Sequence, residues 1–171
     1  MEPSPLTPEL LERMRTIGLR LDRAGTFWHE GTAVTHPRLR QALLRWLDIS
    51  GDGRDIVRLD DKRYAYVEIE DAHLRARSAR WDGDRCFVLW DDDREAELDY
   101  GGLRQAPDHA LYTTARDRLR GRIAGPAYHA IAERIVEESR GAEESRGAED
   151  GGAGAFLLEA AGRRWPIAGA A

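Results

Sequence analysis

Three cationic positions in this chain have a residue type and a sequence context that suit anion binding. Lys62, the only lysine, stands beside two aspartates at the start of an expected strand. Arg116 ends another expected strand, and His36 comes directly before an expected helix. The amino end of a helix carries partial positive charge, which favours a bound anion nearby. These side chains are therefore candidates for an anion site, although each can also form an ordinary surface ion pair.

Arg23 and Trp28 lie close together in an expected hairpin and could complete such a site. A guanidinium binds phosphate or carboxylate through charge-assisted hydrogen bonds, and an indole ring offers a stacking face. For Trp28, a place in the core is favoured over this stacking role. Asp71, or its neighbour Glu70, could instead serve as the general base of an enzyme, but a carboxylate in that role needs a cleft and a shifted pKa.

Motifs typical of catalysis and metal binding are missing from the sequence. The five histidines lack metal-site spacing, and there is no phosphate loop, no dinucleotide-binding glycine motif and no nucleophile elbow. Residues 48–53 match only the start of a calcium loop, because Leu59 stands where a bidentate glutamate is required. We expect the acidic run 91–93 to be a solvated loop. The sequence predicts no catalytic residue, no cofactor and no metal.

Composition narrows the class of protein. With 171 residues, 42% of them hydrophobic, the chain can form one compact domain or two small halves. A net charge of −5 argues against binding to a nucleic-acid backbone. The single cysteine, Cys86, allows no intrachain disulfide and lies in an expected buried strand. No apolar run approaches the ~20 residues of a membrane span, and no secretory leader is visible, so we expect a cytoplasmic protein.

Two segments have the same pattern, in which a short strand is followed by proline and then by a helix. The first covers residues 34–37 and a helix to about Leu47, and the second covers residues 123–126 and a helix that includes Ile135 and Val136. This repeat predicts an internally duplicated α+β fold with mainly antiparallel sheets. A cleft is expected where the two halves meet.

The remaining elements follow from alternation of apolar and polar residues and from turn residues. Thr7 and Pro8 predict a helix that ends near Met14. Strands are expected at residues 19–21, 26–29, 56–59, 64–69, 74–81, 85–90 and 111–116, with a final hairpin in 156–167. We divide the chain into an N-terminal extension (1–17), an N-terminal half (18–80) and a C-terminal half (81–171). Residues 138–154 contain one hexapeptide twice and are expected to form a low-complexity surface linker.

Four segments together resemble DUF1285, an uncharacterised bacterial family. They are residues 23–34 (R-A-G-T-F-W-H-E-G-T-A-V), 67–72 (V-E-I-E-D-A, beside the family's V-E-D-A-P-F), 112–123 and 156–167. In order and spacing the resemblance covers most of residues 18–138 and the tail. It implies a duplicated α+β fold whose C-terminal half resembles a pleckstrin-homology barrel. It also implies a nucleotide-like ligand between the halves, a role in signalling and no catalytic activity.

The chain departs from the family pattern at several positions. The family's arginines before the two helices fall on His36 and Gly125, and the proline of its central motif falls on His73. Arg23 and Arg116 are retained. The departures predict that this chain binds the family's ligand differently or not at all.

The leading hypothesis is a non-enzymatic cytoplasmic ligand-binding or signalling module that binds a nucleotide-like anion between its halves. The candidate site consists of six side chains: Arg116, Arg23, Lys62, His36, Trp28 and Asp71. One alternative is a protein-interaction module that docks a peptide beside a helix or along an exposed strand. A second alternative is an enzyme with Asp71 or Glu70 as its base.

Overall fold

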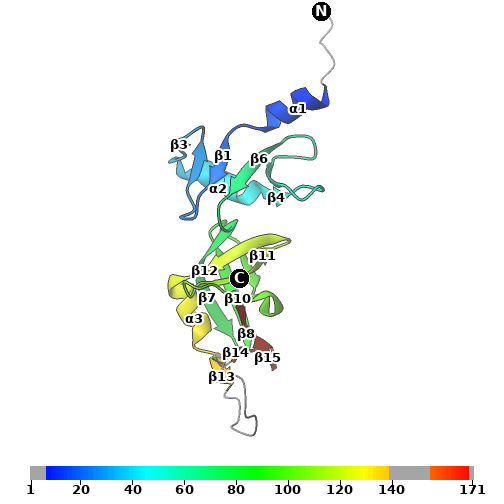
Figure 1. The fold of residues 1–171 in the computed structure, drawn as a ribbon. Helices are drawn as coiled ribbons and strands as arrows, with labels where there is room; N and C mark the ends of the chain where they lie inside the picture. The colour runs from blue at the N-terminus through cyan, green and yellow to red at the C-terminus, as the bar shows by residue number, and fades with distance from the viewer. Residues whose placement is uncertain (1–6, 139–154, 170–171) are drawn as a thin grey trace, which may run out of the picture.

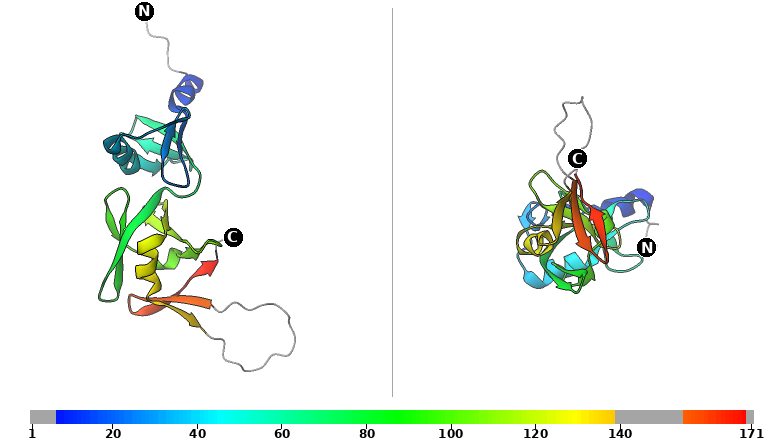
Figure 2. Two further views of the ribbon diagram at one scale, coloured as in Figure 1. Left: turned by 90° about the vertical axis from the view of Figure 1, so that its left-hand side faces the viewer. Right: turned by 90° about the horizontal axis from the view of Figure 1, so that it is seen from below.

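The computed structural model describes residues 7–138 and 155–169 of the chain. The expected low-complexity linker, residues 138–154, therefore lies outside the described residues except for its first position. The described chain forms two sheet-rich halves arranged along one axis, with the N-terminal half at the top of Figure 1. The three-stranded sheet of the C-terminal half lies at the far end of the molecule from the N-terminal half (Figure 2, left panel).

Each half combines helices with strands, which confirms the α+β class. The N-terminal half contains α1 (Pro8–Arg15), β1 (Leu19–Leu21), β2 (Phe27–His29), β3 (Thr32–Ala33), α2 (Pro37–Trp46), β4 (Leu47–Ile49), β5 (Asp55–Arg58) and β6 (Tyr64–Ile69). The C-terminal half contains β7 (Leu74–Asp82), β8 (Arg85–Trp90), β9 (Glu95–Glu97), the 3-10 turn η1 (Tyr100–Gly102), β10 (Arg104–Gln105), β11 (Leu111–Arg116), β12 (Leu119–Ile123), α3 (Gly125–Ala132), β13 (Ile135–Glu138), β14 (Ala155–Ala160), β15 (Arg163–Pro166) and β16 (Ala168–Gly169).

The strands form three sheets. The N-terminal half has the order β3-β2-β1-β6-β5-β4, and the C-terminal half has the orders β16-β10-β11-β12-β7-β8-β9 and β13-β14-β15. Most neighbours are antiparallel, as expected, but β1–β6, β12–β7 and β10–β16 are parallel pairs. The long order is open at β16 and β9, so strand pairing among the described residues does not close the barrel implied by the family resemblance.

The two halves repeat one series of elements, which confirms the duplication. An antiparallel hairpin, β1–β2 or β11–β12, precedes a helix with proline in its first turn, α2 or α3. A three-stranded antiparallel meander then follows, β4-β5-β6 or β13-β14-β15. Proline suits the first helical turn because its φ angle is already helical and its missing N–H has no partner there.

Helix α3 is shorter than the sequence pattern predicts. It ends at Ala132, whereas Ile135 and Val136, expected on its apolar face, belong to β13. There they lie opposite Leu158 and Leu157 of β14. β-Branched side chains pack well on a strand, and this cross-strand pairing outweighs the helical spacing.

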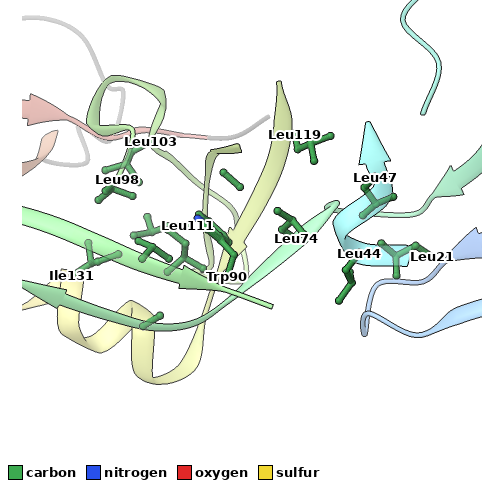
Figure 3. Close-up of a cluster of buried hydrophobic side chains, with 14 of the residues drawn as sticks. Leu21, Leu44, Leu47, Leu74, Trp90, Leu98, Leu103, Leu111, Leu119 and Ile131 are labelled. Atoms are coloured by element: carbon green, nitrogen blue, oxygen red, sulfur yellow. The ribbon is translucent and has the colours of Figure 1, made fainter. Parts of the chain in front are cut away.

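The chain passes from one half to the other in residues 70–73, between β6 and β7. All of β7 belongs to the seven-stranded sheet, so the passage comes earlier than the boundary expected after residue 80. Both halves contribute to one buried apolar cluster, in which Leu74 and Leu119 lie between Trp90 and the α2–β4 residues Leu44 and Leu47 (Figure 3). Burying a leucine contributes about 1.5–3 kcal/mol, so apolar packing couples the halves.

Gly121 in β12 offers a test of this core. A Cβ atom at Gly121 would lie 2.3 Å from the Trp90 ring and 2.9 Å from the Ala115 methyl group. We expect Gly121→Ala to lower the free energy of unfolding by about 1–3 kcal/mol, because the ring must shift. Urea denaturation measures the change. Gly51→Ala is the control, since a Cβ there meets no atom within 4 Å; equal stability of the two variants would contradict this packing.

Candidate functional site

Asp91 and Asp92, the first two residues of the acidic run after β8, lie at the junction of the halves and not in solvent as expected, whereas Asp93 is exposed. Asp91 and Asp92 are buried, and their main-chain carbonyls accept hydrogen bonds from α2. Gln41 Nε2 lies 3.2 Å from the Asp91 oxygen, and Arg45 Nε lies 3.3 Å from the Asp92 oxygen. The sequence analysis was wrong for Asp91 and Asp92 because a run of acidic residues gives no sign of its distant partners.

Arg116 pairs with Asp92 in this junction. Its Nε donates to Asp92 Oδ2 at 3.1 Å, and the two side chains are 17% and 0% exposed. The remaining guanidinium nitrogens donate to the carbonyls of Leu44, at 3.2 Å, and Leu47, at 3.5 Å. These carbonyls end α2, where partial negative charge favours a cation. Arg116 therefore already has intramolecular partners on each side of its guanidinium.

Asp91 is incompletely paired. Its Oδ1 accepts the N–H of Arg75 at 3.1 Å, but its buried Oδ2 has no hydrogen-bond partner among the described residues. The Arg40 guanidinium lies 3.7 Å from this oxygen. Burial raises the pKa of Asp91 and outweighs the neighbouring arginines, which act in the opposite direction. A raised pKa means that the folded state holds a proton on this group more readily than the unfolded chain does.

The β1–β2 turn, which carries Arg23, docks on the same junction. The Arg75 side chain donates to the carbonyls of Asp22 and Arg23, each at 2.8 Å. Trp28, the other candidate in this hairpin, donates its indole N–H to Asp22 Oδ2 at 2.8 Å. That bond lowers the pKa of Asp22. Arg23 contributes main-chain atoms to these contacts, and its N–H also donates to Glu70 at 3.1 Å.

His36 and Lys62 lie far from Arg116. His36 caps α2, where its Nδ1 accepts the N–H of Leu39 at 3.4 Å. Because α2 has ten residues and rises about 15 Å, His36 and Arg116 lie at opposite ends of the helix. Lys62 is in the β5–β6 turn and borders a cleft beside α1 with Met14. One phosphate group cannot contact all three cations.

Asp71 lies in the passage between the halves. The Tyr112 hydroxyl donates a hydrogen bond to the Asp71 carboxylate, at 2.8 Å from Oδ1 and 3.0 Å from Oδ2. The Arg122 guanidinium lies 3.6 Å from the same carboxylate. Burial, followed by this hydrogen bond, raises the pKa of Tyr112. Glu70, the other suggested base, pairs with Arg20. Both carboxylates therefore have intramolecular partners.

His73 joins the halves in a way that the sequence did not suggest. Its Nε2 lies 2.7 Å from Asp55 in β5, and its Nδ1 accepts the N–H of Arg120 in β12 at 3.0 Å. An acceptor at Nδ1 places the proton of the neutral ring on Nε2, which donates to Asp55. The only sequence signal was that His73 replaces the proline of the family motif.

A cleft of about 560 Å³ lies within the C-terminal half, between the β7–β8 and β14–β15 turns. The turns are joined by a hydrogen bond of 2.7 Å from Ala161 N to the Asp84 carbonyl. Positive φ angles at Ala161 and Gly162 reverse the chain tightly between β14 and β15. The cleft is lined by Asp84, Arg134, Glu159, Ala160, Gly162, Arg163 and Arg164.

Two guanidiniums at this cleft, which we call the arginine cleft, stack on tryptophan rings. Arg134 lies 3.9 Å from the Trp81 ring centre, and Arg163 lies 3.9 Å from that of Trp165. Indole N–H groups fix both rings: that of Trp81 donates to the Ala130 carbonyl at 2.7 Å, and that of Trp165 donates to the Ala160 carbonyl at 3.0 Å. Within the described residues, neither guanidinium has a carboxylate partner or donates a hydrogen bond.

The sequence analysis did not single out Arg134 or Arg163. One usable signal was the R-x-W spacing of Arg163 and Trp165, which places both side chains on one face of a strand. Arg134 had no such signal, because Trp81 is distant in sequence.

Cys86 and the metal-ligating side chain types provide no further candidate site among the described residues. Burial raises the pKa of the Cys86 thiol to about 11, as expected for a buried strand residue. In the part of the chain that the structure describes, no cluster of three or more histidine, cysteine or carboxylate side chains is arranged to hold a metal ion. No described helix has the length and apolar character needed to cross a bilayer.

The Arg116–Asp92 pair predicts a large effect on stability. Arg116→Ala leaves the Asp92 carboxylate buried without its cation, so we expect a loss of about 3–5 kcal/mol in the free energy of unfolding. Arg77→Ala is the matched control, because the Arg77–Asp93 pair is 51% and 41% exposed and should contribute about 1 kcal/mol or less. Chemical denaturation of both variants distinguishes them, and a small loss for Arg116→Ala would show that the pair does not support the junction.

The raised pKa of Asp91 predicts a pH dependence. A raised folded-state pKa makes the charged form costly, so the penalty is fully present above that pKa and disappears toward the unfolded value of about 3.9. We expect the stability of Asp91→Asn, relative to the native protein, to increase as the pH rises from about 4 toward 7. Denaturation at a series of pH values measures this difference, and a difference that falls with pH would contradict the assignment.

Comparison with known proteins supports the fold. No protein-family model matches the sequence. No curated protein matches it either. Among solved structures, a DUF1285 family protein from Silicibacter pomeroyi DSS-3 superposes with a TM-score of 0.67 at 16% identity, over 98% of this chain and 90% of that chain. A DUF1285 family protein from Shewanella baltica OS155 gives 0.58 at 14% identity, over 70% of this chain and 93% of that chain. The sequence resemblance is thus confirmed at the level of structure, and this chain has the fold of these two DUF1285 family proteins.

Proposed function

We propose that this protein is a non-catalytic binding module for an anionic, nucleotide-like ligand and that the ligand binds in the arginine cleft. The observation that carries the proposal is the pair of tryptophan-stacked guanidiniums, Arg134 and Arg163, which have no carboxylate partner among the described residues. A role in signalling is consistent with such a module.

Stacking prepares these arginines for an anion. The ring holds one face of each guanidinium, so the N–H edges stay available and less rotamer freedom is lost when a ligand binds. Phosphate and carboxylate accept paired hydrogen bonds from such an edge. Asp84 also borders the cleft, so a ligand with a hydroxyl or amino group beside its anionic group fits better than a bare anion. Phosphate next to a ribose has this character.

The junction is a less favourable place for the ligand. An anion at Arg116 would have to replace Asp92, whose side chain is completely buried and would then lack its cation. The six predicted residues remain candidates, but the side chains of Arg116, His36, Trp28 and Asp71 already have intramolecular partners. The arginine cleft needs no such exchange.

A protein-interaction module is the second candidate. Leu10 and Met14 of α1 are exposed, and Met14 shares an open cleft with the exposed Leu59. Exposed apolar groups of this kind are typical of contact surfaces. This candidate would use the opposite end of the molecule from the arginine cleft (Figure 1).

The binding proposal is tested by melting temperature and calorimetry with inorganic phosphate, nucleotides and cyclic dinucleotides. A ligand at 100 times its dissociation constant adds about 2.7 kcal/mol of stability. We expect the double variant Arg134→Gln, Arg163→Gln to bind at least about tenfold more weakly, since each charged hydrogen bond contributes about 1.5–3 kcal/mol.

Arg80→Gln is the control, because Arg80 pairs with Glu95 in the same half and does not line the cleft. Its affinity should equal that of the native protein. A native protein that none of these anions stabilises, or a double variant with unchanged affinity, would refute the proposal and favour the protein-interaction module.

A further inference from the structure

A second cleft, which we call the helix cleft, lies beside α3. It has a volume of about 320 Å³ and is more enclosed than the arginine cleft. Its walls come from α3, from the β10–β11 segment and from the strands that follow α3. The lining residues are Gln105, His109, Tyr128, Ala132, Ile135, Phe156 and Ile167.

Five of the seven side chains that line the helix cleft are apolar or aromatic, but more of the exposed lining surface is polar than apolar. Tyr128 and Phe156 contribute rings, and Ile135 and Ile167 contribute branched side chains. Phe156 is 41% exposed, although its neighbours in the strand, Leu157 and Leu158, are buried. A ring that is left uncovered at a concave surface gains contacts when another flat group covers it.

Two polar groups face the same space. The Gln105 amide offers a donor and an acceptor, and the His109 imidazole offers a further nitrogen. Within the described residues, neither side chain makes a hydrogen bond. His109 lies in a turn with a φ of 66°, and its own N–H donates to the Ala106 carbonyl at 2.9 Å. Left-handed backbone at a residue other than glycine is uncommon and recurs at binding sites.

A cavity that combines aromatic and aliphatic side chains with a few convergent polar groups is a usual form of a small-ligand site. We infer that the helix cleft binds a flat heteroaromatic ring whose edge carries both a hydrogen-bond donor and an acceptor. The ring would stack against Tyr128 or Phe156, and its edge would pair with the Gln105 amide. A saturated apolar group would leave the amide without a hydrogen-bond partner, which is unfavourable because the bound group also excludes water from the amide.

The helix cleft is separate from the arginine cleft. Phe156 and Ala160, which line the two clefts, lie four residues apart on β14, a distance of about 13 Å. The inference therefore does not depend on the proposed anion site. The ring could belong to a free base or to a larger ligand, and a neutral base without phosphate isolates the ring chemistry.

The test uses adenine as the probe and two-dimensional ¹H–¹⁵N NMR of the full chain as the readout. We expect saturable shifts at backbone amides of α3 and of residues 105–109, with a dissociation constant on the order of millimolar for so small a ligand. Phenol, which lacks the paired donor and acceptor edge, should bind more weakly. Adenosine monophosphate that binds no better than adenine would identify the ring alone as the ligand; tighter binding would identify the ring as part of a nucleotide.

Two variants and a control complete the experiment. Ala132→Leu fills the cleft and should weaken adenine binding at least about tenfold, and Gln105→Leu should weaken adenine but not phenol. Ala124→Leu is the control, because Ala124 is exposed just before α3 and does not line the cleft. If Ala132→Leu does not fold, Gln105→Leu alone decides. No saturable shift with the native protein, or unchanged adenine affinity in Gln105→Leu, overturns the inference.

Discussion

The junction of the two halves depends on one buried ion pair, Arg116 with Asp92. A carboxylate that is fully buried must be neutralised, and Arg116 does so while it also caps the carbonyls of Leu44 and Leu47 at the end of α2. The pair therefore fixes three elements at once: the end of β8, the end of β11 and the C-terminal turn of α2. Apolar packing of Leu74 and Leu119 against Leu47 supplies the surrounding dry environment (Figure 3).

The cost of burying an unpaired charge also distinguishes the structural arginines from those available for a ligand. At the junction, burial makes an unpaired charge costly, so Arg75 and Arg116 each have several intramolecular acceptors. At the arginine cleft, a tryptophan ring covers one face of Arg134 and one face of Arg163. Stacking restrains these side chains without satisfying their N–H groups, which is the state that favours recognition of an external anion.

Local patterns predicted many of the elements. Alternation of apolar and polar residues located β1, β5, β6, β7 and β8, and proline after a strand located α2 and α3. The prediction for Ile135 and Val136 was wrong because helical spacing and strand propensity conflict there, and pairing with β14 decides between them. Because the low-complexity segment separates β13 from β14, the pairing of these two strands is not apparent from the sequence. The expectation for Asp91 and Asp92 was wrong for a related reason, since their burial depends on α2, far away in the sequence.

The sequence alone determined the α+β class, the duplication, the starts of the three helices and the candidate cations, because caps, prolines and periodicity act over a few residues. Tertiary structure decided which charges became buried and which stayed available. Arg116 and the Leu44 carbonyl are 72 residues apart in sequence, and Arg134 reaches Trp81 from a different element. Hydrogen-bonded ion pairs and cation–ring contacts require close approach, so their strength depends on which segments the fold brings together, and a local sequence pattern does not show this.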